Sequence, residues 1–120
     1  MSRDHRKLSV FSQADALVLA LYGETATFPT DERFGLRTQV RRAAVSVPAN
    51  IVEGCARRST REYLQFVNVA TGSAAETLYL LDLSTRLGFM KSDVYRRLES
   101  GYTLLIQGLK KLQNSLEGEP

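Results

Sequence analysis

Seven arginines between positions 33 and 61 are the residues of this sequence whose types and spacing point most clearly to a binding function. The same interval holds one acid, Glu53, so its local charge is +6, whereas the rest of the chain, with nine basic and twelve acidic residues, carries −3. A guanidinium binds phosphate oxygens through paired hydrogen bonds, so phosphate recognition is the chemistry that this composition favours. We expect these side chains to form one basic edge. The candidate nucleic-acid-binding residues are Arg37, Arg41, Arg42, Arg57, Arg58 and Arg61.

A run of arginines has a second explanation, because it can also form a solvated face or a lattice of salt bridges between subunits. The net charge is only +3, no RNA-binding sequence motif is present, and most aromatic residues fall on expected core faces. We therefore keep two functions open. The first is binding of nucleic acid, in particular RNA or an RNA-containing complex. The alternative is a protein–protein interaction scaffold that does not bind nucleic acid.

Catalytic and metal-binding chemistry has little support in the sequence. Cys55 is the only cysteine and His5 the only histidine, which leaves no zinc tetrad, no intramolecular disulfide and no Cys–His pair. We interpret Cys55 as a small, partly buried residue rather than as a reactive thiol. We predict a protein without enzymatic activity, cofactor or metal, although a helical bundle can contain a site that residue spacing does not reveal.

The elements that position these residues are predicted to be helices. In the arginine-rich interval, apolar residues recur with the spacing of a core-facing helix. They are Leu36, Val40, Ala43, Ala44, Val47 and Ile51. We expect this second helix to be capped by Thr30 and to kink at Pro48, because proline lacks an amide donor and crowds the carbonyl four residues earlier. Gly54, near its end, is interpreted as a helix-end or packing glycine.

Three further helices complete the predicted fold. The first spans about residues 10–22, and the third begins at a capping box formed by Ser59 and Glu62. Gly88 ends the third helix, and the fourth opens at Ser92. The fold class is therefore all-α, an antiparallel up-down four-helix bundle.

The bundle is expected to form a single domain over residues 1–120, with loose tails at about 1–8 and 117–120. The longest apolar run has seven residues, far fewer than the roughly 20 that a membrane-spanning helix needs. We therefore expect no membrane association and a cytoplasmic location.

The third helix has apolar residues on a second side as well, which indicates burial on two sides. The second cover is most simply another subunit, so these positions are candidates for an oligomer interface: Val69, Glu76, Leu80, Leu83 and Leu87. Gly72 weakens the helix, and we expect close packing to offset this. Glu76 should pair with an arginine of the same or an adjacent subunit, since a lone buried carboxylate is unfavourable. A catalytic carboxylate is the alternative, but no second acid or histidine is spaced beside it.

Several segments resemble a known family. The central stretch reads LRTQVRRAAVSVPANIVEGCARRSTREYLQFVNVATGSAAE, and shorter segments read KLSVFSQA, FPTDERFGL and LGF. Together they resemble bacterial four-helix-bundle proteins that were first described as products of intervening sequences in large-subunit ribosomal RNA genes. The resemblance covers nearly the whole chain. Phe11 departs from it, because a tryptophan is expected there, but an aromatic ring is retained.

This resemblance implies a ring-shaped homopentamer of antiparallel four-helix bundles. It also implies kinship with the accessory protein of diversity-generating retroelements, which works with a reverse transcriptase and binds nucleic acid. A reverse transcriptase is thus a candidate protein partner. The family has no established enzymatic activity, so the resemblance supports the fold more strongly than the function.

Overall fold

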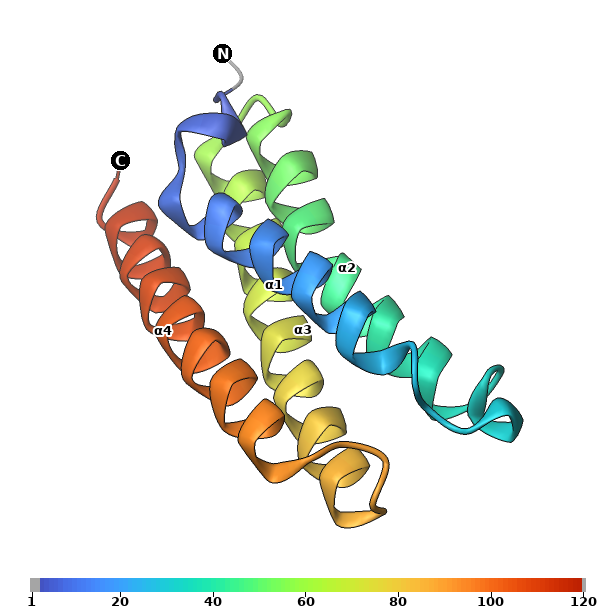
Figure 1. Cartoon of the computed structure of the whole chain (residues 1–120). Helices are drawn as coiled ribbons and strands as arrows, with labels where there is room; N and C mark the ends of the chain where they lie inside the picture. Colours follow the sequence, from blue (N-terminus) through green and yellow to red (C-terminus); the bar gives the residue numbers. More distant parts are fainter. Residues whose placement is uncertain (1–2, 120) are drawn as a thin grey trace.

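Four long helices make up most of the computed structural model, which describes residues 3–119 (Figure 1). No strand occurs within these residues. The bounds of the helices are α1 Ser9–Thr25, α2 Leu36–Cys55, α3 Thr60–Arg86 and α4 Ser92–Glu117. Two short 3-10 helices precede α1 and α2, and they are η1 His5–Lys7 and η2 Thr30–Glu32.

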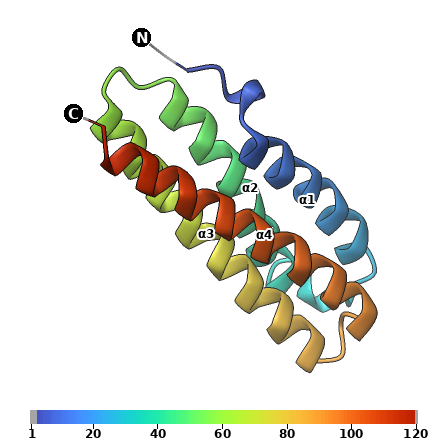
Figure 2. The same ribbon diagram turned by 90° about the vertical axis from the view of Figure 1, so that its left-hand side faces the viewer.

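Successive helices run antiparallel, and each packs against two neighbours (Figures 1 and 2). The neighbouring pairs are α1 with α2, α2 with α3, α3 with α4 and α4 with α1, whereas the backbones of the diagonal pairs do not approach each other closely within the described residues. The bundle measures 48 × 24 × 19 Å, and both termini lie at the same end as the α2–α3 turn. The predicted all-α four-helix fold is confirmed.

The core is built from the predicted faces. All six apolar residues that define the inner face of α2 are buried. At Gly54 the chains approach closely, because an added Cβ would lie 2.9 Å from Phe66 Cβ and 2.9 Å from Tyr63 Cδ1. The interpretation of Gly54 as a packing glycine is therefore confirmed. None of the described helices combines the length and apolar character needed to cross a membrane.

The predicted boundaries of α3 are also confirmed. Ser59 Oγ accepts a hydrogen bond from Glu62 N at 3.1 Å, which is the first bond of a capping box, and it donates one to Glu62 Oε1 at 3.1 Å. At the other end Gly88 has a φ of 82°, a conformation that glycine adopts without strain, and Phe89 N donates to Ser84 O at 2.9 Å.

The second helix differs from its prediction in two respects. It begins at Leu36 rather than after Thr30. Its N-cap residue is Gly35, and the Glu32 carboxylate accepts a hydrogen bond from the first helical amide, Leu36 N, at 3.1 Å. It also runs without interruption through Pro48, so the predicted kink is not confirmed. Pro48 is buried between the fully buried Val47 and Ile51, and this packing holds the helix against the core on both sides of the missing hydrogen bond.

The predicted second apolar face of α3 is smaller in the structure. Leu80 is only 2% exposed within its own chain, because it lies beside Thr77 and Ser84 at the margin of the core-facing arc. Its assignment to an oligomer interface is therefore corrected to a place in the core. Leu83 is half-buried, whereas Val69 and Leu87 are 52% and 53% exposed. No atom of the described chain approaches an added Cβ at Gly72 within 4 Å, so the close packing expected there is not found in the monomer.

The two tails make specific contacts where the structure describes them. Arg3 N donates to Cys55 O at 2.8 Å, and Arg3 Nη2 donates to Thr60 Oγ1 at 3.1 Å. The same guanidinium lies 3.6 Å from Glu119 Oε2. Residues 1, 2 and 120, which belong to the predicted loose tails, lie outside the described residues. Within the described range, then, both ends of the chain are tied to the α2–α3 turn.

Candidate nucleic-acid interface

The arginines of the basic interval fall into two groups. The α2 group lies near the amino-terminal half of α2 and consists of Arg33, Arg37, Arg41 and Arg42. The turn group lies at the α2–α3 turn and consists of Arg57, Arg58 and Arg61. At a helical rise of 1.5 Å per residue, Arg42 and Arg57 are about 22 Å apart along the helix axis. The single basic edge expected from the sequence is therefore divided between one flank and one end of the bundle.

Arg41 is engaged within the fold. Its Nε donates to Thr25 Oγ1 at 2.9 Å, its Nη2 donates to Tyr22 O at 3.0 Å, and its Cζ lies 4.3 Å from the centre of the Tyr22 ring. Thr25 is fully buried and donates in turn to Leu21 O at 2.8 Å. A cation at the carboxyl end of a helix also interacts favourably with the helix dipole. Arg41 thus joins α1 to α2.

The other arginines of both groups form no ion pair with a carboxylate among residues 3–119. Two of them lie against aromatic rings, since Arg33 Cζ is 5.1 Å from the Phe34 ring centre and Arg57 Cζ is 4.7 Å from that of Phe66. The ion pairs in the described chain are Arg3–Glu119, Arg6–Asp4, Arg86–Asp82 and Arg97–Glu24. A salt-bridge lattice within one chain therefore does not account for the basic interval.

Two grooves flank the exposed ridge of α2. They share Thr38, Arg42 and Ser46, which are spaced four residues apart and so line up along the helix. The α1-side groove has a volume of about 420 Å³ and is lined by Tyr22, Thr38, Arg41, Arg42, Val45 and Ser46. The α3-side groove has a volume of about 430 Å³ and is lined by Phe34, Gly35, Thr38, Gln39, Arg42, Ala43, Ser46, Ser73 and Glu76.

The grooves differ in charge. The lining of the α1-side groove contains two arginines and no acid, whereas the α3-side groove contains Glu76. Glu76 is exposed and forms no ion pair within residues 3–119, although Arg42 lines the same groove. Water can solvate an exposed carboxylate, which removes the reason for predicting a buried arginine partner. Ser46 Oγ and Ser73 Oγ lie 2.8 Å apart and link the two helices along this groove.

The turn group lies in a more mixed environment. Glu53 and Glu62 are exposed on either side of the turn, and their charge opposes that of the three arginines. Beneath the turn Cys55 is buried, and this burial raises the pKa of its thiol, which disfavours the nucleophilic thiolate. The interpretation of Cys55 as a small buried residue is thus confirmed. Burial likewise raises the pKa of the Tyr63 phenol, over which Arg3 Cζ lies at 4.4 Å.

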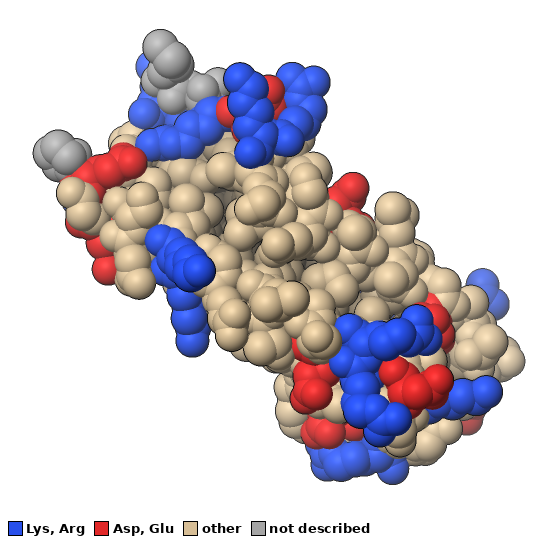
Figure 3. Space-filling view, turned by 60° about the vertical axis from the view of Figure 1, so that its left-hand side comes forward, with Lys and Arg blue, Asp and Glu red and all other residues tan. Residues whose placement is uncertain are grey.

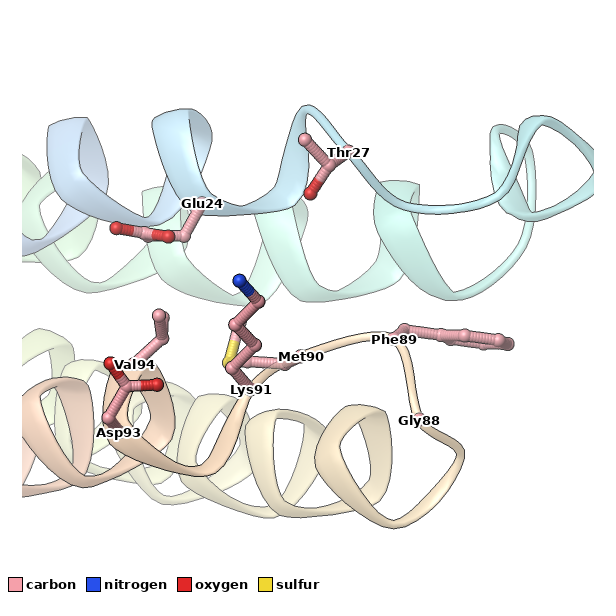
Figure 4. Close-up of a pocket in the computed structure, with 8 residues that line it drawn as sticks. All are labelled: Glu24, Thr27, Gly88, Phe89, Met90, Lys91, Asp93 and Val94. Carbon is pink, nitrogen blue, oxygen red and sulfur yellow. The ribbon is translucent and has the colours of Figure 1, made fainter.

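Another hollow, of about 470 Å³, lies away from both arginine groups (Figure 4). It separates the carboxyl end of α1 from the α3–α4 connection, and Glu24, Lys91 and Asp93 supply its charged side chains. Within residues 3–119 no group of three or more His, Cys, Asp or Glu side chains is placed to hold a metal ion. The hollow therefore has mixed charge and no arrangement that points to a particular ligand.

The face formed by α1 and α4 carries its charged side chains mainly near the two ends of the bundle (Figure 3). Uncharged residues cover most of the area between them. Phosphate binding requires positive charge, so this face is a poor candidate for nucleic acid.

The sequence analysis missed the aromatic residues of this site. Phe34 is 86% exposed and Tyr22 is 41% exposed, although aromatic residues were expected mostly on core faces. Phe34 follows Arg33 and precedes Gly35 in the connection between α1 and α2, which projects at the lower right of Figure 1. The feature of the sequence that could have indicated this site is an aromatic residue, Phe34, directly next to an arginine, Arg33.

Comparisons with known proteins agree with this fold. The sequence model of a family described as 23S rRNA-intervening sequence protein matches residues 6–111. A crystal structure of a protein of unknown function from the S23 ribosomal protein family of Bacteroides thetaiotaomicron superimposes with a TM-score of 0.81. The two chains are 21% identical, and the alignment covers 88% of this chain and 95% of the other. A search of curated proteins gave no match.

Proposed function

Since the chain belongs to the 23S rRNA-intervening sequence protein family, we propose that it is a non-enzymatic protein that binds RNA or an RNA-containing complex through the amino-terminal half of α2. The observation that carries this proposal is the α1-side groove, where arginine side chains meet no acid. Arg42 at its edge has no carboxylate partner among the described residues. The Arg42 guanidinium therefore remains available for phosphate oxygens.

The two arginine groups have different roles in this proposal. Arg37 and Arg42 contact phosphates, while Arg41 stays bonded to α1 and shapes the groove. The turn group provides a second, weaker contact, because Glu53 and Glu62 lie beside it. A strand that reaches both groups must span about 22 Å along α2.

Self-assembly would strengthen such binding. The proposed homo-oligomer, a pentamer in the ring expected from the resemblance, repeats the α2 group once per subunit, so several weak contacts act together. Val69 in α3 and Leu87 just after its end are exposed apolar residues that are available for contact between subunits, with Leu83 partly so. Light scattering in dilute buffer measures the subunit number directly.

An interaction scaffold is the second candidate function. The face of α1 and α4 favours it, because most of its area between the two ends is uncharged, which suits a protein partner better than it suits nucleic acid (Figure 3). A reverse transcriptase is one such partner. Purification with and without nuclease treatment separates the two functions, since a direct protein partner remains bound after nucleic acid has been removed.

The direct test is a binding titration with a labelled RNA at low salt and at moderate salt, about 50 and 200 mM. We expect the double variant Arg37→Ala, Arg42→Ala to bind several-fold more weakly than the wild type. The matched control is Lys110→Ala, Lys111→Ala, which removes the same charge from the exposed side of α4, the helix that lies diagonally across the bundle from α2. Absence of binding at low salt, or equal losses in both double variants, would overturn the proposal.

A further inference from the structure

Phe34 is exposed in the connection that precedes α2, and it lines the α3-side groove together with Arg42. We infer that this surface takes unpaired nucleic acid, with one base stacked on the Phe34 ring and the adjoining phosphates held by Arg33, Arg37 and Arg42. The inference rests on the proposed nucleic-acid binding and specifies the class of ligand. It is carried by the exposure of the ring, by the arginine beside it and by the unequal charge of the two grooves.

The turn that presents Phe34 is fixed by contacts on both sides of the ring. Thr38 Oγ1 donates a hydrogen bond to Arg33 O, and the Glu32 carboxylate accepts one from Leu36 N. Gly35 lets that carboxylate come close, because an added Cβ would lie 3.0 Å from Glu32 Oε2. The ring is therefore held outside the core on a defined turn, and a preorganised ring loses little conformational entropy when a ligand binds.

Stacking on an aromatic side chain distinguishes unpaired nucleic acid from a duplex. In a duplex each base face is covered by the next base pair, whereas a single strand can place a base face against a ring. Arginine beside the ring adds a contact to the phosphate or to the base. The Arg33 guanidinium lies 5.1 Å from the Phe34 ring centre, so both kinds of group are present at one point.

The unequal charge of the two grooves determines on which side of the ridge the phosphate backbone of the bound strand lies. Phosphates favour the α1-side groove and the ridge residue Arg42, where no acid lines the surface. Glu76 in the α3-side groove repels phosphate but accepts hydrogen bonds from amino groups of bases. A base on Phe34 that points toward Glu76 therefore gains from carrying an exocyclic amino group. We expect cytosine and adenine oligomers to bind more tightly than uracil oligomers.

The chain contains no tryptophan, so Phe34→Trp introduces a single fluorescent reporter at the stacking position. We expect oligocytidine of about 12 nucleotides to quench this fluorescence with the same midpoint as a binding titration of the labelled oligomer. The control is Leu104→Trp, at an exposed position of α4, and its fluorescence should not change. A duplex of the same length should bind more weakly and quench less.

A second pair of variants separates stacking from general apolar contact. Phe34→Leu keeps apolar bulk and removes the ring, and we expect it to weaken single-strand binding about tenfold, while Phe34→Trp retains affinity. Both variants should fold normally because Phe34 is 86% exposed. Equal binding of single strand and duplex, together with an unchanged Phe34→Leu, would overturn this inference, whereas continued sensitivity to Arg37→Ala, Arg42→Ala would leave the proposed function intact.

Two other outcomes also decide the matter. If no nucleic acid binds at low salt, both the inference and the proposed function fail. If the fluorescence of Phe34→Trp changes with protein concentration in the absence of nucleic acid, and oligomers then cause no quenching, the ring is covered by a second copy of the chain and the inference fails.

Discussion

Arg41 and Arg42 are neighbours in the sequence, but their side chains have different surroundings. Arg41 satisfies a buried hydroxyl and a helix carbonyl, whereas Arg42 lies exposed on the ridge between the grooves. Sequence reasoning grouped them because both belong to one charged run. It could not separate them, because the partners of Arg41 lie 16 and 19 residues earlier in the chain and meet it only through packing of α1 on α2.

We predict that Arg41→Ala lowers the free energy of unfolding by about 1–2 kcal/mol, because it removes the guanidinium donor to the Thr25 hydroxyl and to the Tyr22 carbonyl. Arg42→Ala should change it by less than about 0.5 kcal/mol, since its side chain is exposed. Urea unfolding followed by circular dichroism measures both. Equal effects of the two substitutions would contradict the structural role of Arg41.

The buried tyrosines and cysteine predict a loss of stability at alkaline pH. Burial raises the pKa of Cys55, Tyr63 and Tyr102, so the folded state keeps protons that the unfolded state releases. The contribution of these groups to the free energy of unfolding is complete at pH values below their ordinary pKa values, 9.0 for the thiol and 10.0 for the phenols. It declines as the pH rises above those values. The urea concentration at the midpoint of unfolding should therefore decrease as the pH is raised from about 9 to about 10.5.

Tyr102→Phe provides the control for this pH dependence. Its hydroxyl has no hydrogen-bond partner among the described residues, so the substitution should be close to neutral at pH 7. It should also reduce the alkaline decline of the urea midpoint. A midpoint that does not depend on pH over this range would show that these groups titrate alike in both states.

At the scale of helices, the local pattern of the sequence was sufficient for much of the fold. The inner face of α2, the Ser59 capping box and the Gly88 terminus depend on spacing within one helix, and all were predicted correctly. The exposure of Phe34 and the burial of Leu80 depend on where neighbouring elements end. Those positions are set by tertiary packing, which helical periodicity does not encode.

Alanine substitutions at two glycines, one in α2 and one in α3, should have opposite effects on stability. Gly54→Ala should lower the free energy of unfolding by about 1–3 kcal/mol, because its Cβ would collide with Tyr63 and Phe66. Gly72→Ala should raise it by about 0.5–1 kcal/mol, since the position is helical and open within the chain. Chemical denaturation of dilute protein measures both. Destabilisation by Gly72→Ala would indicate that another subunit packs there.

At the scale of the whole molecule, self-assembly can be tested by substituting exposed apolar residues in α3 and at its carboxyl end. Val69→Asp and Leu87→Asp should reduce the subunit number in light scattering without unfolding the helices, because both side chains are about half exposed in one chain. Leu80→Ala should instead lower the free energy of unfolding by about 2–5 kcal/mol, since Leu80 belongs to the core. Assembly that persists in both charged variants would require a different interface.

The division of the arginines is the feature of the whole molecule that sequence reasoning could not supply. A charge count over a segment does not register the length of the helix that separates its ends, which here is about 22 Å from Arg42 to Arg57. The α2 group and the turn group therefore face different surroundings, and only the α2 group combines arginines, an acid-free groove and exposed rings.

The most direct test of this account is the salt dependence of single-stranded RNA binding by two triple-alanine variants, one at Arg33, Arg37 and Arg42 and the other at Arg57, Arg58 and Arg61. Both variants remove three charges, so a difference between them reflects position rather than net charge. The account predicts that the slope of log affinity against log salt becomes shallower by about 2 for the first variant and changes much less for the second. A larger change in the second variant, or equal changes in both, would contradict it.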